Sequence, residues 1–398
     1  MTAVPISDVA DRAEFEAVIR GLREREAVVP VVLDGGLRAW VITRYAEGRA
    51  ALRDQRLVKN PHEVNAFKGV RHAEDSYVVE GRHMLNSDGA DHVRLRGVVA
   101  SQLLPASAVA ALRPAVAEIA GRLLDDMGTT SSADLMAAYA RPLPELVMGR
   151  VLGIPEESIL ALARLSRRLA TREDSASAGM RAAYNDAVDL VRAEMTGTPP
   201  PGTVLATLLD AVAERRITRR ELVSTVLMLL AAGTSSTTIA IGHGAATLAG
   251  TASTLRALLE SEETSADLVE ELIRHHPPFP FSPWRFAREA IEIDGITIPA
   301  GSVVFILLAA VNRDPAVIER PEQLVPGRRL PTGHLTFGYG PHFCVGANLA
   351  RMEIATALRT LFDRFPNLTL AIPYSDVAWT GLLFDRTITA LPVLPQSA

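Results

Sequence analysis

Apolar residues recur at the three- and four-residue spacing of an amphipathic helix along most of the chain. In the first such segment Phe15, Ile19 and Leu22 share one face, and charged residues occupy the other. A later segment is apolar nearly all round in its middle, which is typical of a buried helix. The pattern predicts helices over Asp11–Glu26, several between residues 91 and 194, and then over Arg219–Gly250, Ser265–His275 and Val345–Phe365.

A two-residue alternation replaces the helical spacing in short stretches near both ends of the chain. The expected strands are Val28–Leu33, Ala39–Thr43, Trp284–Arg288, Ile291–Asp294, Thr297–Pro299, Val303–Phe305 and Thr387–Val393. Asp34-Gly35-Gly36 predicts a hairpin turn between the first two. No internal repeat is visible, and Pro199-Pro200-Pro201 is read as a surface loop because helical sequence resumes beyond it. We therefore predict a mainly α fold with small β-sheets, built as one domain over residues 1–398.

Composition narrows the class of protein. The 398 residues are 48% hydrophobic and 22% charged, as in ordinary globular proteins. The net charge of −5 offers no basic excess to neutralise a phosphate backbone, so we expect no nucleic-acid partner. Met1–Gly21 lacks the apolar core of a signal peptide, and Leu222–Gly233 and Val303–Val311 are too short to cross a bilayer. The expectation is a cytoplasmic monomer without membrane contact.

The single cysteine, Cys344, excludes an intrachain disulfide and a cysteine-based zinc site. It follows Phe337-Gly338-Tyr339-Gly340-Pro341-His342-Phe343, where glycine and proline predict a tight loop just before a helix. Helix N-termini favour the thiolate over the thiol, and a thiolate is an iron ligand. Taken alone, Cys344 would be read as a small buried apolar residue, which is the usual role of a lone free cysteine.

The pattern Phe-x-x-Gly-x-basic-x-Cys-x-Gly resembles the haem-thiolate loop of the cytochrome P450 family. The resemblance implies that haem b is the cofactor, that Cys344 is the proximal iron ligand, and that His342 meets a haem propionate. It also implies a P450-like fold in which a long central helix crosses over the haem. The family resemblance covers most of the chain, because further motifs follow in the family's order.

Three of those motifs carry cations. His92 and Arg96 resemble the family's His-x-x-x-Arg, and Arg285 lies in a segment similar to the strand that supplies another propionate ligand. By resemblance, these residues and His342 form charge-assisted hydrogen bonds with the two propionates. Each cation alone would be read as a surface residue. Glu271-Leu272-Ile273-Arg274 resembles the Glu-x-x-Arg motif, whose implied role is to anchor the loop under the haem.

The chain departs from the family in the long helix. Ala232-Gly233-Thr234-Ser235-Ser236 resembles the oxygen-activation segment, but Ser235 replaces the usual acid and Ser236 the usual threonine. Gly233 stands where the family's helix opens for oxygen. Ser236 with ordered water could deliver protons, the substrate's own polar groups could complete the relay, or the reaction could have unusual proton demands. Both serines could instead simply bond the carbonyl four residues earlier.

A second departure concerns the Glu-x-x-Arg motif. The family usually has an arginine where Gln323 stands, and Arg320 or Arg328 could substitute for it. The resemblance also places a substrate pocket at about Pro61–Leu85, Leu227–Ser236, Phe279–Trp284 and Thr380–Phe384. Its expected lining is Phe279, Phe281, Leu382, Leu383 and Phe384, with Ser282 and Thr380 as polar points. Such a lining suits a lipophilic molecule of moderate size.

The implied function is a monooxygenase of the soluble bacterial type that uses O2 to hydroxylate, epoxidise or otherwise oxidise a secondary metabolite. No reductase segment is visible, so electrons are expected from a separate ferredoxin and ferredoxin reductase, docking at Arg328, Arg329 and Arg351. The alternatives are an oxidase that performs coupling, a non-catalytic haem-binding helper protein, and a gas sensor. Motifs of other enzyme classes, such as His-Glu-x-x-His and the P-loop, are absent from the sequence.

Overall fold

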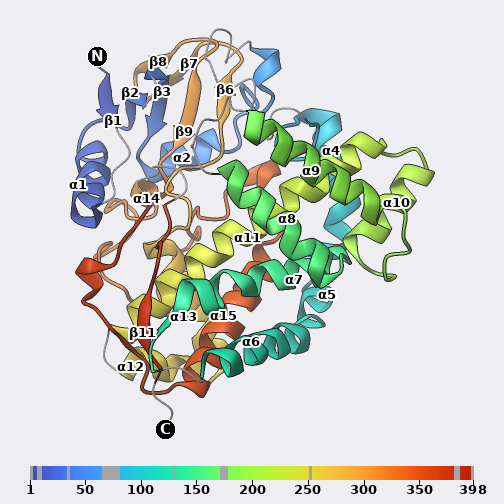
Figure 1. The fold of residues 1–398 in the computed structure, drawn as a ribbon. Coiled ribbons are helices and arrows are strands. Elements are labelled where there is room, and N and C mark those ends of the chain that lie inside the picture. The colour runs from blue at the N-terminus through green and yellow to red at the C-terminus, as the bar shows by residue number, and fades with distance from the viewer. Residues whose placement is uncertain are drawn as a thin grey trace.

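The structure is a computed structural model that describes residues 3–6, 11–33, 36–64, 81–128, 131–170, 178–250, 253–380 and 386–395. Helices fill most of the molecule, and the larger sheet lies at one corner, at the upper left of Figure 1. The predicted mainly α fold with small sheets is confirmed. The longest helix, α11 (Arg219–Ala249), runs through the middle of the helical part.

The predicted helices are all present, with bounds that differ by a few residues. Before α11 the helices are α1 (Arg12–Arg23), α2 (Tyr45–Ala51), α4 (Gly89–Leu103), α5 (Ala106–Ala110), α6 (Arg113–Met127), α7 (Pro142–Leu152), α8 (Glu156–Ala170), α9 (Ala178–Glu194) and α10 (Val204–Ala213). After it come α12 (Ser253–Arg256), α13 (Glu262–His275), α14 (Leu308–Val311) and α15 (Ala347–Arg364). A five-residue π-helix, Met136–Ala140, precedes α7.

Eleven strands are named within the described residues, in three sheets. The six-stranded sheet has the order β1 (Val4–Ile6), β2 (Val28–Leu33), β3 (Arg38–Ile42), β9 (Val303–Ile306), β6 (Arg285–Ala287) and β4 (Leu57–Val58). The others are β10 (Thr369–Leu370), β11 (Pro392–Leu394) and β5 (Ala133–Asp134), and the pair β7 (Ile291–Ile293) and β8 (Ile296–Ile298). Parallel pairing of β3 with β9 joins distant parts of the sequence.

The first hairpin and the last strand differ in how well the sequence predicted them. The hairpin is confirmed in its pairing, since β2 runs antiparallel to β3 with Val31 opposite Ala39, although two of its turn residues lie outside the described part. The last strand was predicted too early, over Thr387–Val393. In the structure β11 is Pro392–Leu394, and Ile388 makes only an isolated bridge to Trp379.

The long helix begins at a capping box. The Thr218 hydroxyl accepts a hydrogen bond from the Glu221 N–H at 3.1 Å, and the Glu221 carboxylate accepts one from the Thr218 N–H at 2.8 Å. The box satisfies backbone donors that a helix start leaves unpaired. Beyond it, most side chains of α11 are buried, as the all-round apolar pattern predicted. Burial of most of its side chains places α11 in the core of the helical part.

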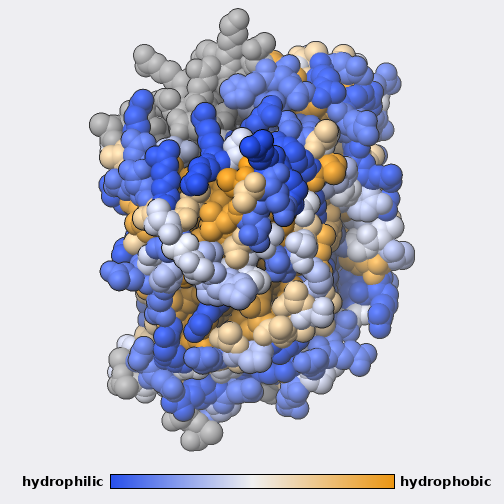
Figure 2. All heavy atoms as spheres, turned by 90° about the vertical axis from the view of Figure 1, so that its right-hand side faces the viewer, coloured by the Kyte–Doolittle hydropathy of each residue, from blue (hydrophilic) through white to orange (hydrophobic). Residues whose placement is uncertain are grey.

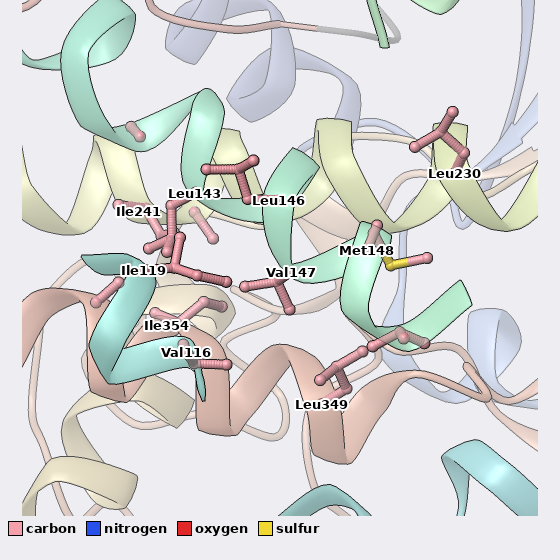
Figure 3. Close-up of a cluster of buried hydrophobic side chains, with 14 of the residues drawn as sticks. Val116, Ile119, Leu143, Leu146, Val147, Met148, Leu230, Ile241, Leu349 and Ile354 are labelled. Atoms are coloured by element: carbon pink, nitrogen blue, oxygen red, sulfur yellow. The ribbon is translucent and has the colours of Figure 1, made fainter. Parts of the chain in front are cut away.

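The main hydrophobic core is formed where α6, α7, α11 and α15 meet. Figure 3 shows Met148 and Val147 of α7 directed toward α11 and α15, with Ile119 of α6 and Ile354 of α15 completing the cluster. The core therefore ties α15, the helix that follows Cys344, to the long central helix.

Within the described residues, α11 is the one helix that is long and apolar enough to cross a membrane. The most apolar part of it is 72% buried inside the fold, which is typical of a core helix. Gly89–Leu103 with Ala106–Met127 would pass the same test only if this pair, bent by 49°, counted as one span. From the sequence, Leu222–Gly233 was predicted to be too short to cross a bilayer. In the structure this stretch is part of a 31-residue helix.

Candidate active site

The loop before Cys344 turns back on itself at two glycines. Gly338 and Gly340 have φ values of +74° and +79°, in the left-handed region that favours glycine. A Cβ atom on Gly340 would also lie 2.9 Å from Arg53 Cγ. The Cys344 N–H donates to the Phe337 carbonyl at 2.8 Å and closes the loop. The predicted tight loop is confirmed, and Cys344 at its end is partly buried.

Cys344 lies two residues before Gly346, the N-cap of α15, and not on the first turn of the helix. Burial raises the pKa of its thiol, while the Gly346 N–H, Arg96 and Arg351 act in the opposite direction. The N–H at the helix end therefore acts in the expected direction, but desolvation of the charged form outweighs it. Coordination to a metal ion would remove the proton outright.

Four predicted cationic residues gather near Cys344. The rings of His92 and His342 lie 4.1 Å apart between centroids, on α4 and on the loop before the cysteine. Arg96 lies one turn beyond His92 on α4 and acts electrostatically on both His92 and Cys344. Arg285, at the start of β6, acts on His342 in the same way. The structure thus brings together residues from three distant segments of the sequence.

Two of these side chains carry buried donors without partners. His92 and Arg285 are 5% and 3% exposed, and His92 Nε2 and Arg285 Nε have no hydrogen-bond partner within the described residues. Burial lowers the pKa of His92, and it lowers that of Arg285 to about 10. Unpaired buried polar groups cost about 1–3 kcal/mol each, so the site favours an anionic occupant. These donors fit haem, whose two carboxylates would satisfy them.

Sequence reasoning missed two residues in this cluster, Asp88 and Lys59. Asp88 Oδ1 lies 3.5 Å from His342 Nε2, and Asp88 Oδ2 accepts the N–H groups of Lys59 and Asn60 at 2.6 and 3.1 Å. Burial and the nearby Arg285 hold the pKa of Lys59 well below its usual range. The one available signal was that Lys59 is one of only two lysines in the chain.

The Glu-x-x-Arg pair is buried and anchors the segment that precedes the cysteine loop. Arg274 Nε donates to Glu271 Oε2 at 2.7 Å, and both side chains are 3% exposed or less. The third arginine is Arg328, whose Nε lies 3.2 Å from Glu271 Oε1. Of the two substitutes considered, Arg328 therefore supplies the charge, while Gln323 contributes its backbone carbonyl to Arg274 at 3.1 Å.

The middle of α11 has an open face. Ala232 is exposed and Gly233, Ser235 and Ser236 are partly exposed, although the helix is mostly buried on either side of them. α11 is continuous through this stretch, so the expected opening of the helix at Gly233 is not present. A Cβ atom on Gly233 would lie 2.7 Å from Met148 Sδ, which explains the glycine by packing.

The two serines differ in their bonding. The Ser236 hydroxyl donates to the Ala232 carbonyl at 2.7 Å, the arrangement that serine commonly adopts in mid-helix. The Ser235 hydroxyl has no hydrogen-bond partner among the described residues. Neither side chain contacts a carboxylate in the described part of the chain. The hydroxyl of Ser236 must therefore rotate before it can donate elsewhere.

The expected substrate lining is only partly available to a ligand. Phe281 and Ser282 are 2% and 3% exposed; Phe281 packs on Phe305 and the Ser282 hydroxyl accepts the Ile306 N–H at 3.0 Å, so both belong to the sheet. Phe279 and Thr380 stay partly exposed. Leu382, Leu383, Phe384 and residues 65–80 lie outside the described residues. Figure 2 shows hydrophobic residues recessed between hydrophilic ones on the face that carries α4 and α10.

A pocket of about 370 Å³ opens beside the cysteine loop. Its walls include Phe337, Tyr339, Phe343, Glu270 and Arg351. Arg351 lies over the Phe337 ring at 4.4 Å and pairs with Glu270 at 2.5 Å. The pocket therefore combines aromatic walls with a neutralised carboxylate.

The three arginines expected at a docking surface differ in exposure. Arg329 is exposed, Arg351 is partly exposed, and Arg328 is 10% exposed and engaged with Glu271. Arg328 is therefore a structural residue. Two other arginines, Arg49 and Arg53, lie over the Tyr339 ring at 4.1 and 5.6 Å.

Comparison with known proteins identifies the family. Residues 266–370 match the family model for cytochrome P450. The chain is 35% identical to 6-deoxyerythronolide B hydroxylase of Saccharopolyspora erythraea, over 99% of each chain. Two solved structures are similar over nearly their whole length. One is the tirandamycin C-bound P450 monooxygenase TamI, with 30% identity, a TM-score of 0.87, and coverage of 99% of this chain and 100% of that one. The other is CxnD, a P450 for C–S bond formation in chuangxinmycin biosynthesis, with 28% identity, a TM-score of 0.89, and coverage of 100% and 98%.

The chain belongs to the cytochrome P450 family. Its cofactor is haem b, and it is a monooxygenase that uses O2 and electrons from redox partners to oxidise a lipophilic small molecule. Its relatives place it among the bacterial enzymes of secondary-metabolite tailoring. The suspected family and enzyme class are confirmed, and the roles of the individual site residues remain predictions.

Proposed function

We propose that Cys344 binds the haem iron and that His92, Arg96, Arg285 and His342 hold the haem propionates. The observation that supports this assignment is a pair of buried nitrogens, His92 Nε2 and Arg285 Nε, that have no hydrogen-bond partner among the described residues. His92 contacts His342, which lies two residues before the only cysteine of the sequence. When bound, haem supplies the activation of dioxygen. The protein's residues would orient the cofactor, and the bond from the Cys344 N–H to the Phe337 carbonyl would hold the sulfur in place.

The test is the absorption spectrum of the reduced, carbon-monoxide-bound protein. A strongly red-shifted Soret band is expected for thiolate ligation, and Cys344→Ser should lose that band while keeping the fold. A band at shorter wavelength in the native protein would contradict ligation by the Cys344 thiolate. Absence of haem from the purified protein would contradict the proposed haem site itself.

For proton delivery we favour Ser236 acting with an ordered water. The Ser236 hydroxyl donates to Ala232 at 2.7 Å, which leaves its oxygen lone pairs free to accept from water. Rotation about the Cα–Cβ bond then turns the proton toward the open face of the helix. Ser236→Ala should uncouple oxygen consumption from product formation, whereas Ser235→Ala is the matched control one residue away. Unchanged coupling in Ser236→Ala would favour delivery by the substrate's own hydroxyl groups.

For the substrate we propose a polyketide-derived lactone or a similar lipophilic secondary metabolite. The support is similarity over nearly the whole chain to a hydroxylase named for 6-deoxyerythronolide B and to a tirandamycin-bound enzyme. A second candidate reaction is oxidative bond formation, because CxnD, which is named for C–S bond formation, is equally similar in fold. Titration of macrolactones, tetramic acids and indolic thiols against the ferric Soret band would separate these classes. If none of these compounds shifts the ferric Soret band, both candidates are contradicted.

We also propose that a separate, acidic ferredoxin and its reductase supply the electrons to a monomeric, cytoplasmic enzyme. Arg49, Arg53 and Arg351 beside the aromatic pocket support a docking surface near Cys344. Arg53→Glu should slow reduction by the ferredoxin and weaken its salt dependence. Arg168→Glu, on the distant helix α8, is the control. Equal rates of reduction for the two variants would contradict docking of the ferredoxin at Arg53.

A further inference from the structure

Asp88 lies at the point where three segments of the haem site meet. It immediately precedes α4, the helix that carries His92, and yet its side chain does not cap that helix. One carboxylate oxygen accepts the N–H groups of Lys59 and Asn60 at the end of β4, at 2.6 and 3.1 Å. The other lies 3.5 Å from His342 Nε2. The carboxylate therefore links the β-sheet and the start of α4 to the cysteine loop.

Lys59 extends the same link to Arg285. Its side chain is buried, and Lys59 Nζ donates to the carbonyls of Pro283 and Trp284 at 3.2 and 2.9 Å. Those two residues directly precede Arg285, whose Nε has no partner in the part of the chain that the structure describes. A buried ammonium group bound to two consecutive carbonyls restrains the backbone at that point. The orientation of the Arg285 side chain on β6 thus depends on Lys59. It also depends on Asp88, because the Lys59 backbone N–H donates to the Asp88 carboxylate.

We propose that Asp88 and Lys59 are positioning residues that orient His342 and Arg285 toward the haem propionates. The inference rests on the proposed haem site, since it assumes that His342 and Arg285 meet the cofactor there. Neither residue needs to touch the cofactor. Asp88 orients the imidazole of His342 with its carboxylate, and Lys59 fixes the backbone from which Arg285 extends.

Charge and positioning predict opposite effects when Asp88 is changed. Asp88 is the carboxylate that acts on Lys59, His92, Arg285 and His342 together. Removing its charge makes the site more positive, so by electrostatics alone the dianionic haem would bind more tightly. If Asp88 acts by positioning, the loss of its contacts loosens His342, and haem is released faster despite the added positive charge.

The experiment measures haem transfer from the ferric holoprotein to an excess of haem-free myoglobin. For Asp88→Asn we expect release about tenfold faster, the size of one lost hydrogen bond to a charged group. The matched control is Asp91→Asn, which removes a carboxylate from the start of the same helix. Among the described residues, Asp91 pairs with Arg82 and Arg94 and not with the haem-site cluster. The control variant should release haem at the native rate. Slower release from Asp88→Asn would overturn the proposal and show a purely electrostatic role.

Two further measurements test the path of the effect. In a His342→Gln background, Asp88→Asn should change the release rate much less than in the native protein, because the two residues act as a pair. Full additivity would overturn the role through His342. Lys59→Met should also speed release, and a native rate would remove Lys59 from the proposal. The carbon-monoxide spectrum of each variant separates the questions: a thiolate band with an unchanged release rate contradicts only the positioning role, whereas loss of the band in the native protein contradicts the haem site itself.

Discussion

Glu353 offers a stability test that does not depend on catalysis. It lies on α15, is 2% exposed, and its Oε1 has no hydrogen-bond partner in the described part of the chain. Burial raises the pKa of this carboxyl from 4.5 to about 8. The charged form is disfavoured because the core cannot solvate it. Between these two pH values the folded protein therefore keeps a proton that the unfolded chain has released.

The sign of the pH dependence follows from that difference. When the folded state binds more protons than the unfolded state, the free energy of unfolding falls as pH rises. The fall is about 1.4 kcal/mol for each pH unit within the window, or about 3 kcal/mol between pH 5.5 and 7.5. Above pH 8 the group is ionised in both states, so its contribution no longer changes.

The assay is urea unfolding of the ferric holoprotein at pH 5.5, 6.5 and 7.5, followed by far-ultraviolet circular dichroism. Glu353→Gln should lose about 3 kcal/mol less than the native protein over that range, whatever its absolute stability. Glu319→Gln, at a side chain 85% exposed, is the control and should keep the native slope. Equal slopes in the native protein and Glu353→Gln would refute a protonated, buried Glu353.

Three other substitutions test packing and the anchor of the loop. Gly340→Ala should destabilise the protein by about 1–2 kcal/mol, because alanine is strained at φ +79°; thermal unfolding and haem content check this. Arg328→Met should lower the free energy of unfolding by about 1.5–3 kcal/mol, because Glu271 loses a charged partner, and an unchanged melting temperature would contradict that role. Gly233→Ala should cost about 1–3 kcal/mol if Met148 cannot move; Met148→Ala in the same chain should recover part of it.

Local sequence was enough for the elements that depend on neighbouring residues. The helical spacing predicted α11 and α15 to within a few residues, and the loop before Cys344 followed from glycine and proline. The last strand was misplaced, because Pro392–Leu394 is a strand only through its pairing with β5 and β10. Pairing between distant segments leaves no periodic signal in either segment.

The sequence by itself determined the family, the mainly α fold and the set of candidate residues from His92 to Cys344, since these depend on motifs and local periodicity. Only the tertiary structure decided which charges meet. It selected Arg328 as the partner of Glu271, assigned Ser282 to the sheet, and revealed Asp88 between Lys59 and His342. The reason is physical: desolvation and hydrogen bonding depend on distances across the fold, which residue spacing along the chain does not specify.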